Sequence, residues 1–214
     1  MKPFFITGTG TGIGKTLLSS ILVQALDADY WKPIQAGIAD GTDTGFVQQH
    51  SNSASVKHKE SYSLQLPASP HIAAREEGIR ISLDTIAADY EAILSGPSHS
   101  NYLIVEGAGG IMVPLNENEF VLDLVKKLQA PVILVSRNYL GSINHSLLTA
   151  AACKANNIPV AGWVFNDQYM QYEQEIAAWT GFPVLASILK LSSVNSSIIE
   201  EQALRIKENL LKYL

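Results

Sequence analysis

Apolar and polar positions divide the chain into short hydrophobic runs and longer segments with helical spacing. Continuous apolar runs of strand length lie at residues 3–7, 30–32, 101–106, 131–136, 158–165 and 182–188. Between them, apolar side chains recur every three or four positions, which predicts helices over residues 15–26, 83–95, 142–156 and 196–213. Ser142 stands where a side-chain cap would begin the third of these helices.

The alternation of strands and helices predicts an α/β fold. Runs that are apolar throughout suit parallel strands buried on both faces, so we expect a mostly parallel sheet with helices on both faces, a three-layer sandwich. No change in composition marks a linker, so residues 1–214 are expected to form a single domain. Residues 38–70 are the least regular part and are interpreted as functional loops and short helices of this domain.

Charge and cysteine content exclude several classes of protein. The 214 residues include 15 Lys and Arg against 20 Asp and Glu, a net charge of −5. Nucleic-acid binders usually have a basic excess and anionic lipid favours basic surfaces, so neither nucleic acid nor a membrane is an expected partner. No stretch approaches the roughly 18 apolar residues of a membrane span. The only cysteine, Cys153, excludes an intrachain disulfide and favours a reducing, cytoplasmic location.

The most informative stretch is a glycine-rich segment between the first predicted strand and the first predicted helix. It reads Gly8-Thr9-Gly10-Thr11-Gly12-Ile13-Gly14-Lys15-Thr16. Glycines let the backbone curl so that N–H groups point at an anion, and the helix N-terminus adds its positive end. Lys15 would reach the outer phosphates of a nucleotide, and the Thr16 hydroxyl would ligate Mg²⁺. The sequence therefore predicts a phosphate-binding loop (P-loop).

This segment departs from the two standard glycine motifs. The strict P-loop pattern requires glycine where Thr9 stands, so this loop is one residue longer. The dinucleotide fingerprint requires a third glycine where Ile13 stands. A glycine-rich turn without a ligand is the alternative, and the Lys15-Thr16 pair favours phosphate binding over it.

Carboxylates at strand ends would hold a metal ion beside such a loop. Glu106 ends one apolar run and precedes four residues rich in glycine, Gly107-Ala108-Gly109-Gly110. Asp43 is the second candidate, although its position also fits a helix N-cap, and Asp40 stays open as an alternative.

Two further polar residues follow predicted strands. Lys32 lies between apolar residues and a proline, where a second lysine would balance charge that develops during phosphoryl transfer. Asn166 could read a nucleobase edge, although asparagine after a strand is also a common turn residue. The five histidines are scattered without metal-ligand spacing, which argues against a zinc site.

Taken together, these segments resemble the dethiobiotin synthetase family over most of the chain, from Phe5 to about Ile188. The segments that carry the resemblance are the loop from Gly8 to Thr16, Tyr30-Trp31-Lys32-Pro33-Ile34, Ser69-Pro70-His71-Ile72, Val105-Glu106-Gly107-Ala108-Gly109-Gly110, Leu140-Gly141-Ser142-Ile143-Asn144-His145 and Gly162-Trp163-Val164-Phe165-Asn166-Asp167. Their order along the chain is the order in the family.

The resemblance implies a P-loop nucleotide hydrolase-like sandwich of the longer-loop branch, working as a homodimer. The implied substrates are ATP, CO₂ and 7,8-diaminononanoate, with Mg²⁺ as the metal ion. One amine takes up CO₂ as a carbamate, the carbamate oxygen attacks the γ-phosphate, and the resulting carbamic–phosphoric anhydride is closed to a ureido ring by the second amine. The products are dethiobiotin, ADP and phosphate.

The resemblance also implies roles for individual residues. Catalytic roles are implied for Lys15, Lys32 and Thr11, and metal ligation for Thr16, Asp43 and Glu106. The implied nucleotide contacts come from Gly12, Ile13, Gly14, Lys15, Thr16, Glu106, Gly107 and Asn166. The implied substrate contacts come from Lys32 and Gly109, and across the dimer interface from Gly141, Ser142, Asn144 and Tyr172.

Two positions depart from the family pattern. Ala36 stands where the family usually has serine or threonine, so that hydroxyl contact is missing or replaced by Gln35. Leu189 stands where a proline often frames the base, which leaves nucleotide selectivity open.

Two other functions fit a loop of this length. Partitioning and division-site ATPases, which act as dimeric switches, carry a signature lysine early in the loop, at the position of Gly10 here. An ATP-dependent amidoligase would normally bring a glutamine-hydrolysing domain with a nucleophilic cysteine, and Cys153 lies inside a predicted helix.

Overall fold

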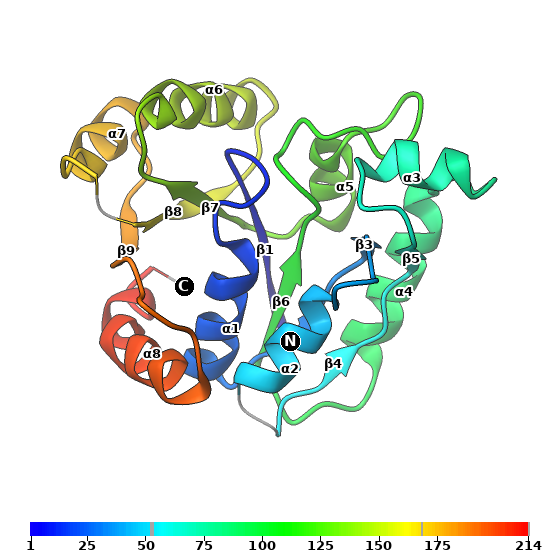
Figure 1. Ribbon diagram of the computed structural model, residues 1–214, viewed down its shortest axis with the longest axis horizontal. Helices are drawn as coiled ribbons and strands as arrows, with labels where there is room; N and C mark the ends of the chain where they lie inside the picture. Colours follow the sequence, from blue (N-terminus) through cyan, green and yellow to red (C-terminus); the bar gives the residue numbers. More distant parts are fainter. Residues whose placement is uncertain (52–53, 168, 214) are drawn as a thin grey trace.

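The computed structural model describes residues 1–51, 54–167 and 169–213 (Figure 1). In these residues the main sheet has seven strands in the order β4-β2-β6-β1-β7-β8-β9, and all neighbouring strands are parallel. They are β1 (Lys2–Gly8), β2 (Asp29–Trp31), β4 (Lys57–His58), β6 (Tyr102–Glu106), β7 (Val132–Arg137), β8 (Val160–Asn166) and β9 (Val184–Ile188). A separate short parallel pair joins β3 (Ile34–Ala36) and β5 (Tyr62–Leu64).

Helices cover both faces of the main sheet. They are α1 (Lys15–Leu26), α2 (Asp43–His50), α3 (Pro70–Glu76), α4 (Leu83–Ser95), α5 (Val121–Leu128), α6 (Ser142–Ala155), α7 (Glu173–Thr180) and α8 (Ser196–Leu210). Figure 1 shows α1 and α8 side by side on one face of the sheet, with α6 and α7 on the other. Among the helices of the described residues, none combines the length and the hydropathy of a membrane span.

Alternating side chains of the strands pack into two separate hydrophobic cores, one on each face of the sheet. Phe4 and Ile6 of β1 pack with α1 and α8 on one face. Phe5 of the same strand lies in the core on the other face, with α4, α5 and α6. This alternation follows from the two-residue period of a strand and explains why the runs are apolar throughout. The structure confirms the predicted three-layer α/β sandwich.

The sequence pattern located the long elements better than the short ones. The helices predicted over residues 15–26 and 83–95 coincide with α1 and α4, whereas the last helix ends at Leu210, before the predicted end at 213. The irregular segment 38–70 contains α2 and the strands β4 and β5. Helices α5 and α7 emerge only from the structure.

The predicted cap of α6 was wrong. The N-cap residue is Gly141, in the left-handed region at φ 102°, and Ser142 is the first residue of the helix. The Ser142 hydroxyl instead lies within hydrogen-bond distance of the Tyr172 hydroxyl, at 2.6 Å. Because φ near 100° is strained for residues with a side chain, glycine is the residue that allows the chain to turn here.

Candidate functional site

The parallel sheet brings the carboxyl ends of its strands to one edge, where the predicted P-loop connects β1 to α1. The loop ends at Gly14, which is the N-cap of α1 and adopts φ 96°. A side chain there would be strained, and its Cβ would lie 2.0 Å from the Asn166 amide nitrogen. Because Gly14 has no side chain, it cannot cap the first backbone amides of α1 with a hydrogen bond. The helix therefore presents its N-terminal amides at the predicted phosphate site.

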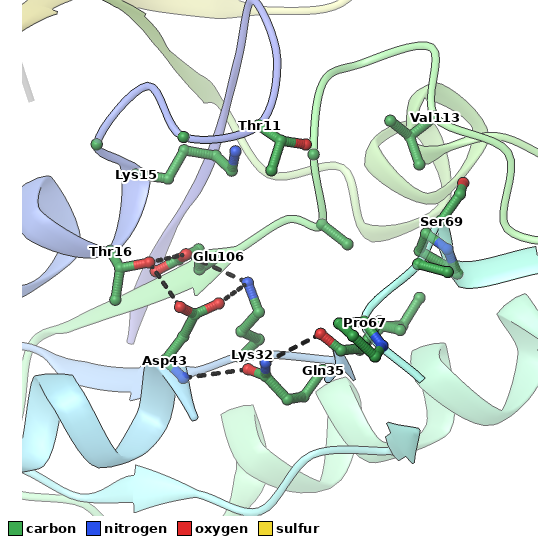
Figure 2. A pocket seen from close by; sticks show the side chains of 18 residues that line it. Thr11, Lys15, Thr16, Lys32, Gln35, Asp43, Pro67, Ser69, Glu106 and Val113 are labelled. Atoms are coloured by element: carbon green, nitrogen blue, oxygen red, sulfur yellow. Dashed lines mark hydrogen bonds and ion pairs between the residues drawn. The ribbon is translucent and has the colours of Figure 1, made fainter. Parts of the chain in front are cut away.

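A cavity of about 730 Å³ opens beside the loop. Figure 2 shows charged and hydroxyl groups gathered at one end, around Lys32 and Glu106, and Pro67 and Val113 at the other. The predicted site residues that line it are Thr11, Gly12, Gly14, Lys15, Thr16, Lys32, Asp43, Glu106 and Gly109. A polar end joined to an apolar wall suits a ligand that carries both phosphate-like and aliphatic parts.

Thr16, Asp43 and Glu106 converge at the polar end although they are far apart in the sequence. The Thr16 hydroxyl lies 2.8 Å from Asp43 Oδ1 and 2.9 Å from Glu106 Oε1 (Figure 2). Asp43 is the first residue of α2, whose cap is Thr42, so its carboxylate is free of the capping role. Asp40, the alternative, is exposed. The structure thus brings together the three oxygen donors that the resemblance implied.

Lys32 binds both carboxylates. Its ammonium lies 2.6 Å from Asp43 Oδ2 and 3.2 Å from Glu106 Oε1, and the residue is 4% exposed. Burial opposes the positive charge, but Glu106 and Asp43 outweigh this cost and raise the pKa of Lys32. Burial likewise opposes the charge of Asp43, and the nearby Lys32 prevails and lowers its pKa. Lys32 is therefore a fixed ammonium group next to the cavity.

Lys15 is the second buried lysine of the site. Its ammonium donates a hydrogen bond to the Gly10 carbonyl, at 2.8 Å. Burial is the largest influence on this group and lowers the pKa of Lys15 to about 8, against the opposing effect of Glu106. Its charge is therefore sensitive to pH within an accessible range.

This pKa predicts proton uptake when a nucleotide binds at alkaline pH. Phosphate favours the ammonium form, so a Lys15 that has lost its proton above pH 8 must regain it on binding. We expect the Kd for ATP to rise about fivefold from pH 8 to pH 9. Calorimetry at pH 9 in buffers of different ionisation enthalpy measures the uptake, and a value of zero would contradict the prediction.

Tyr30 is a site residue that sequence reasoning missed. Its buried hydroxyl donates to Glu106 Oε2 at 2.9 Å, the oxygen that Thr16 and Lys32 do not contact. The only signal was its place two residues before Lys32, since alternate residues of a strand share a face. Tyr30 therefore helps to fix the orientation of the Glu106 carboxylate.

Replacing Tyr30 with phenylalanine is expected to lower the free energy of unfolding by about 1.5–3 kcal/mol, because a hydrogen bond to a buried charged group is lost. Urea denaturation without Mg²⁺ measures the change. Tyr90→Phe is a matched control, since the Tyr90 ring stacks on Trp31 in the core on the opposite face. Equal losses in the two variants would show that the contact with Glu106 has no special weight.

The remaining predicted residues lie outside the main cavity of their own chain. Asn166 donates to the Ile13 carbonyl at 3.1 Å and so braces the P-loop from the end of β8. Gly107 is packed so closely on Phe5 that a Cβ would lie 2.7 Å from the ring. The backbone at Gly107 therefore has no room for a side chain. The contacts of Gly107 and Asn166 with a nucleotide stay predictions.

The residues implied to act across a dimer interface gather around the start of α6. Gly141 and Asn144 are exposed there, next to Leu140, which is 85% exposed. Ser142 and Tyr172 are buried, and the Tyr172 hydroxyl also donates to the Tyr139 carbonyl at 3.0 Å. The Tyr172 hydroxyl is thus occupied within its own chain, and the exposed residues leave the helix N-terminus accessible.

Comparisons with known proteins bear on the family of the whole chain. A protein-family model described as an AAA domain matches residues 2–197. An ATP-dependent dethiobiotin synthetase from Cytophaga hutchinsonii is 44% identical over 211 residues, covering 98% of each chain. A second, from Rhodopseudomonas palustris, is 46% identical over 173 residues, covering 80% of this chain and 78% of that one.

Solved structures with the same fold are more distant in sequence. The MinD cell division protein of Aquifex aeolicus superimposes with a TM-score of 0.59 at 14% identity, covering 97% of this chain and 98% of that one. A ParA family ATPase from Chlorobium tepidum gives a TM-score of 0.56 at 14% identity, covering 99% of this chain and 92% of that one. At such identity these neighbours show a shared P-loop fold and nothing about activity. The full-length similarity to the curated relatives is what decides between the functions that the loop left open, and the chain belongs to the ATP-dependent dethiobiotin synthetase family of ligases.

Proposed function

We propose that this protein forms dethiobiotin from 7,8-diaminononanoate, CO₂ and ATP, with release of ADP and phosphate. The observation that carries the proposal is the single cavity in which the P-loop, two lysines and two carboxylates meet an apolar wall. Its phosphate end suits ATP, and its apolar wall suits the aliphatic chain of the diamine.

Mg²⁺ fits the donors at the polar end. This ion prefers oxygen ligands and is commonly held by one or two carboxylates together with substrate phosphates. Thr16, Asp43 and Glu106 supply a hydroxyl and two carboxylates within hydrogen-bond distance of one another. When bound there, the ion would neutralise charge on the phosphates. The ion pairs of Lys32 with both carboxylates support a position that suits positive charge.

The lysines would carry the charge of the reacting groups. Lys15, at the start of α1, would hold the phosphates with the loop amides and the Thr11 hydroxyl. Lys32 would stabilise the carbamate and the transferring phosphoryl group. The carbamate oxygen would attack the γ-phosphate, and the second amine would then attack the carbamoyl carbon and expel phosphate. Catalysis of this kind depends on position and on preorganised charge.

The exposed N-terminus of α6 would serve a second copy of the chain. In a homodimer, Gly141 and Asn144 of one subunit would receive the substrate carboxylate at the active site of the other.

Asn166 would face the base of the nucleotide. Cys153, the only cysteine of the sequence, cannot form an intrachain disulfide, which suits the cytoplasmic setting that the sequence suggested.

Product analysis tests the proposal directly. Purified protein with ATP, Mg²⁺, bicarbonate and 7,8-diaminononanoate should form dethiobiotin and phosphate in equal amounts. Omitting the diamine should abolish phosphate release. Release that needs no diamine and is stimulated by DNA or by lipid vesicles would overturn the proposal in favour of an ATPase switch.

The proposed carboxylate site predicts a specific kinetic effect at Asn144. Asn144→Asp is expected to raise the KM for the diamine about tenfold, because a second negative charge at the helix N-terminus repels the substrate carboxylate. The same charge is favourable for the helix, so the fold should not suffer. Steady-state kinetics should show an unchanged KM for ATP. An unchanged KM for the diamine would contradict the placement.

A further inference from the structure

Gln35 is a buried residue beside the polar end of the cavity. The residue lies in β3, lines the cavity and is 6% exposed. Its side-chain oxygen accepts a hydrogen bond from the Asp43 backbone N–H at 3.1 Å (Figure 2). Its side-chain nitrogen donates to the Gly37 carbonyl at 2.9 Å and, at 3.4 Å, to the Ala36 carbonyl.

Through these contacts the side-chain amide of Gln35 joins the two ends of the connection between β3 and α2. Asp43 is the first residue of α2, so its N–H has no partner within the helix. The connection from β3 to α2 leaves the strand at Gly37, which adopts φ 79°, and returns at Asp43. Gln35 holds the first residue of the connection, Gly37, with its nitrogen and the first residue of α2, Asp43, with its oxygen. The start of α2 is thereby fixed relative to β3.

Fixing the start of α2 also fixes the Asp43 carboxylate. That carboxylate projects from the same residue and must reach both Thr16 and Lys32, at 2.8 Å and 2.6 Å. A small shift of the helix start would break this geometry, because ligand oxygens at a Mg²⁺ site tolerate little displacement. Thr42 caps the same helix by accepting from the Gly45 N–H at 3.0 Å, but it does not touch the Asp43 backbone N–H.

We propose that Gln35 is a positioning residue of the metal site, acting through the backbone of Asp43. The inference rests on the proposed function only in taking Asp43 as a metal ligand. Both ends of the Gln35 amide are engaged within the chain, which gives this residue a structural role apart from any contact with substrate. Its loss should therefore weaken metal binding more than diamine binding.

Mn²⁺ binding to the enzyme with ADP, followed by the electron paramagnetic resonance signal of free Mn²⁺, tests the proposal without turnover. Partners of metal ligands typically contribute 10- to 100-fold in affinity. We expect Gln35→Met, of similar length but without either hydrogen bond, to weaken Mn²⁺ binding at least tenfold. Gln35→Asn, which keeps the amide but is too short to reach both partners, should also weaken it and serves if the first variant fails to fold.

Two reference variants separate the possible outcomes. Thr42→Ala removes the other cap of α2 and should lower the melting temperature while Mn²⁺ affinity stays within about twofold. Asp43→Asn should weaken Mn²⁺ binding strongly. If Asp43→Asn weakens binding and the Gln35 variants match Thr42→Ala, Gln35 has no positioning role. If Asp43→Asn leaves Mn²⁺ binding intact, the metal assignment fails and the inference about Gln35 fails with it.

Discussion

Replacing Lys15 with alanine is expected to lower the rate of dethiobiotin formation at least 1,000-fold, the scale on which a positioned cation stabilises phosphoryl transfer. Lys15 follows the last glycine of the loop, is the first residue of α1 and lines the cavity. No other lysine in the described part of the cavity wall is free to replace it, because Lys32 is bound to Asp43 and Glu106. Phosphate release in the complete assay measures the loss.

The same variant should fold as well as the parent protein. Burial lowers the pKa of Lys15, which means that the folded state resists its charge at neutral pH. Removing the side chain removes that cost together with one hydrogen bond to Gly10, so the melting temperature should not fall. Lys212→Ala, on the exposed C-terminal turn, controls for the loss of one positive charge. A Lys15→Ala enzyme with more than a tenth of normal turnover would contradict the assigned role.

The sequence predicted the parts of the fold that repeat a simple pattern. Buried parallel strands such as β1 and β7 are apolar at every position because helices cover both faces, and this signal needs no knowledge of neighbours. The short elements between Pro33 and Pro70 gave no such signal, since their few residues are set by contacts with other segments. Helix α5 was missed although its eight residues do carry helical spacing, in the buried positions Val121, Leu122, Leu124, Val125 and Leu128.

The residues of the site also fall into those that the sequence could predict and those that only the structure reveals. Glu106 and Lys32 could be predicted because residues at the carboxyl ends of parallel strands meet at one edge of the sheet. The choice of Asp43 over Asp40 depends on the path of an irregular connection, which only the structure supplies. Tyr30 and Gln35 were missed as partners because their hydrogen bonds join residues whose proximity no local spacing reveals.

Removing the charge of Lys32 is expected to have the second large effect. Its position predicts two separate consequences, one for stability and one for turnover. In Lys32→Met, Asp43 and Glu106 face one another without a cation between them. Breaking a buried ion pair by removing one partner costs about 3–5 kcal/mol, so the free energy of unfolding without Mg²⁺ should fall by about that amount. Added Mg²⁺ should restore part of the loss, because an ion held by Asp43 and Glu106 would supply positive charge in place of the ammonium.

Turnover of Lys32→Met should stay about 100- to 1,000-fold low even in saturating Mg²⁺, because the metal can replace the charge between the carboxylates but not the ammonium that would meet the carbamate. The KM for ATP should change little, since Lys15 and the loop amides are the groups proposed to hold the phosphates. Lys32→Arg is the matched variant: it keeps the charge, so stability should return, while its planar group cannot take the place of a compact ammonium and activity should stay low. Full activity of Lys32→Met in Mg²⁺ would reduce Lys32 to a structural counter-ion of Asp43 and Glu106.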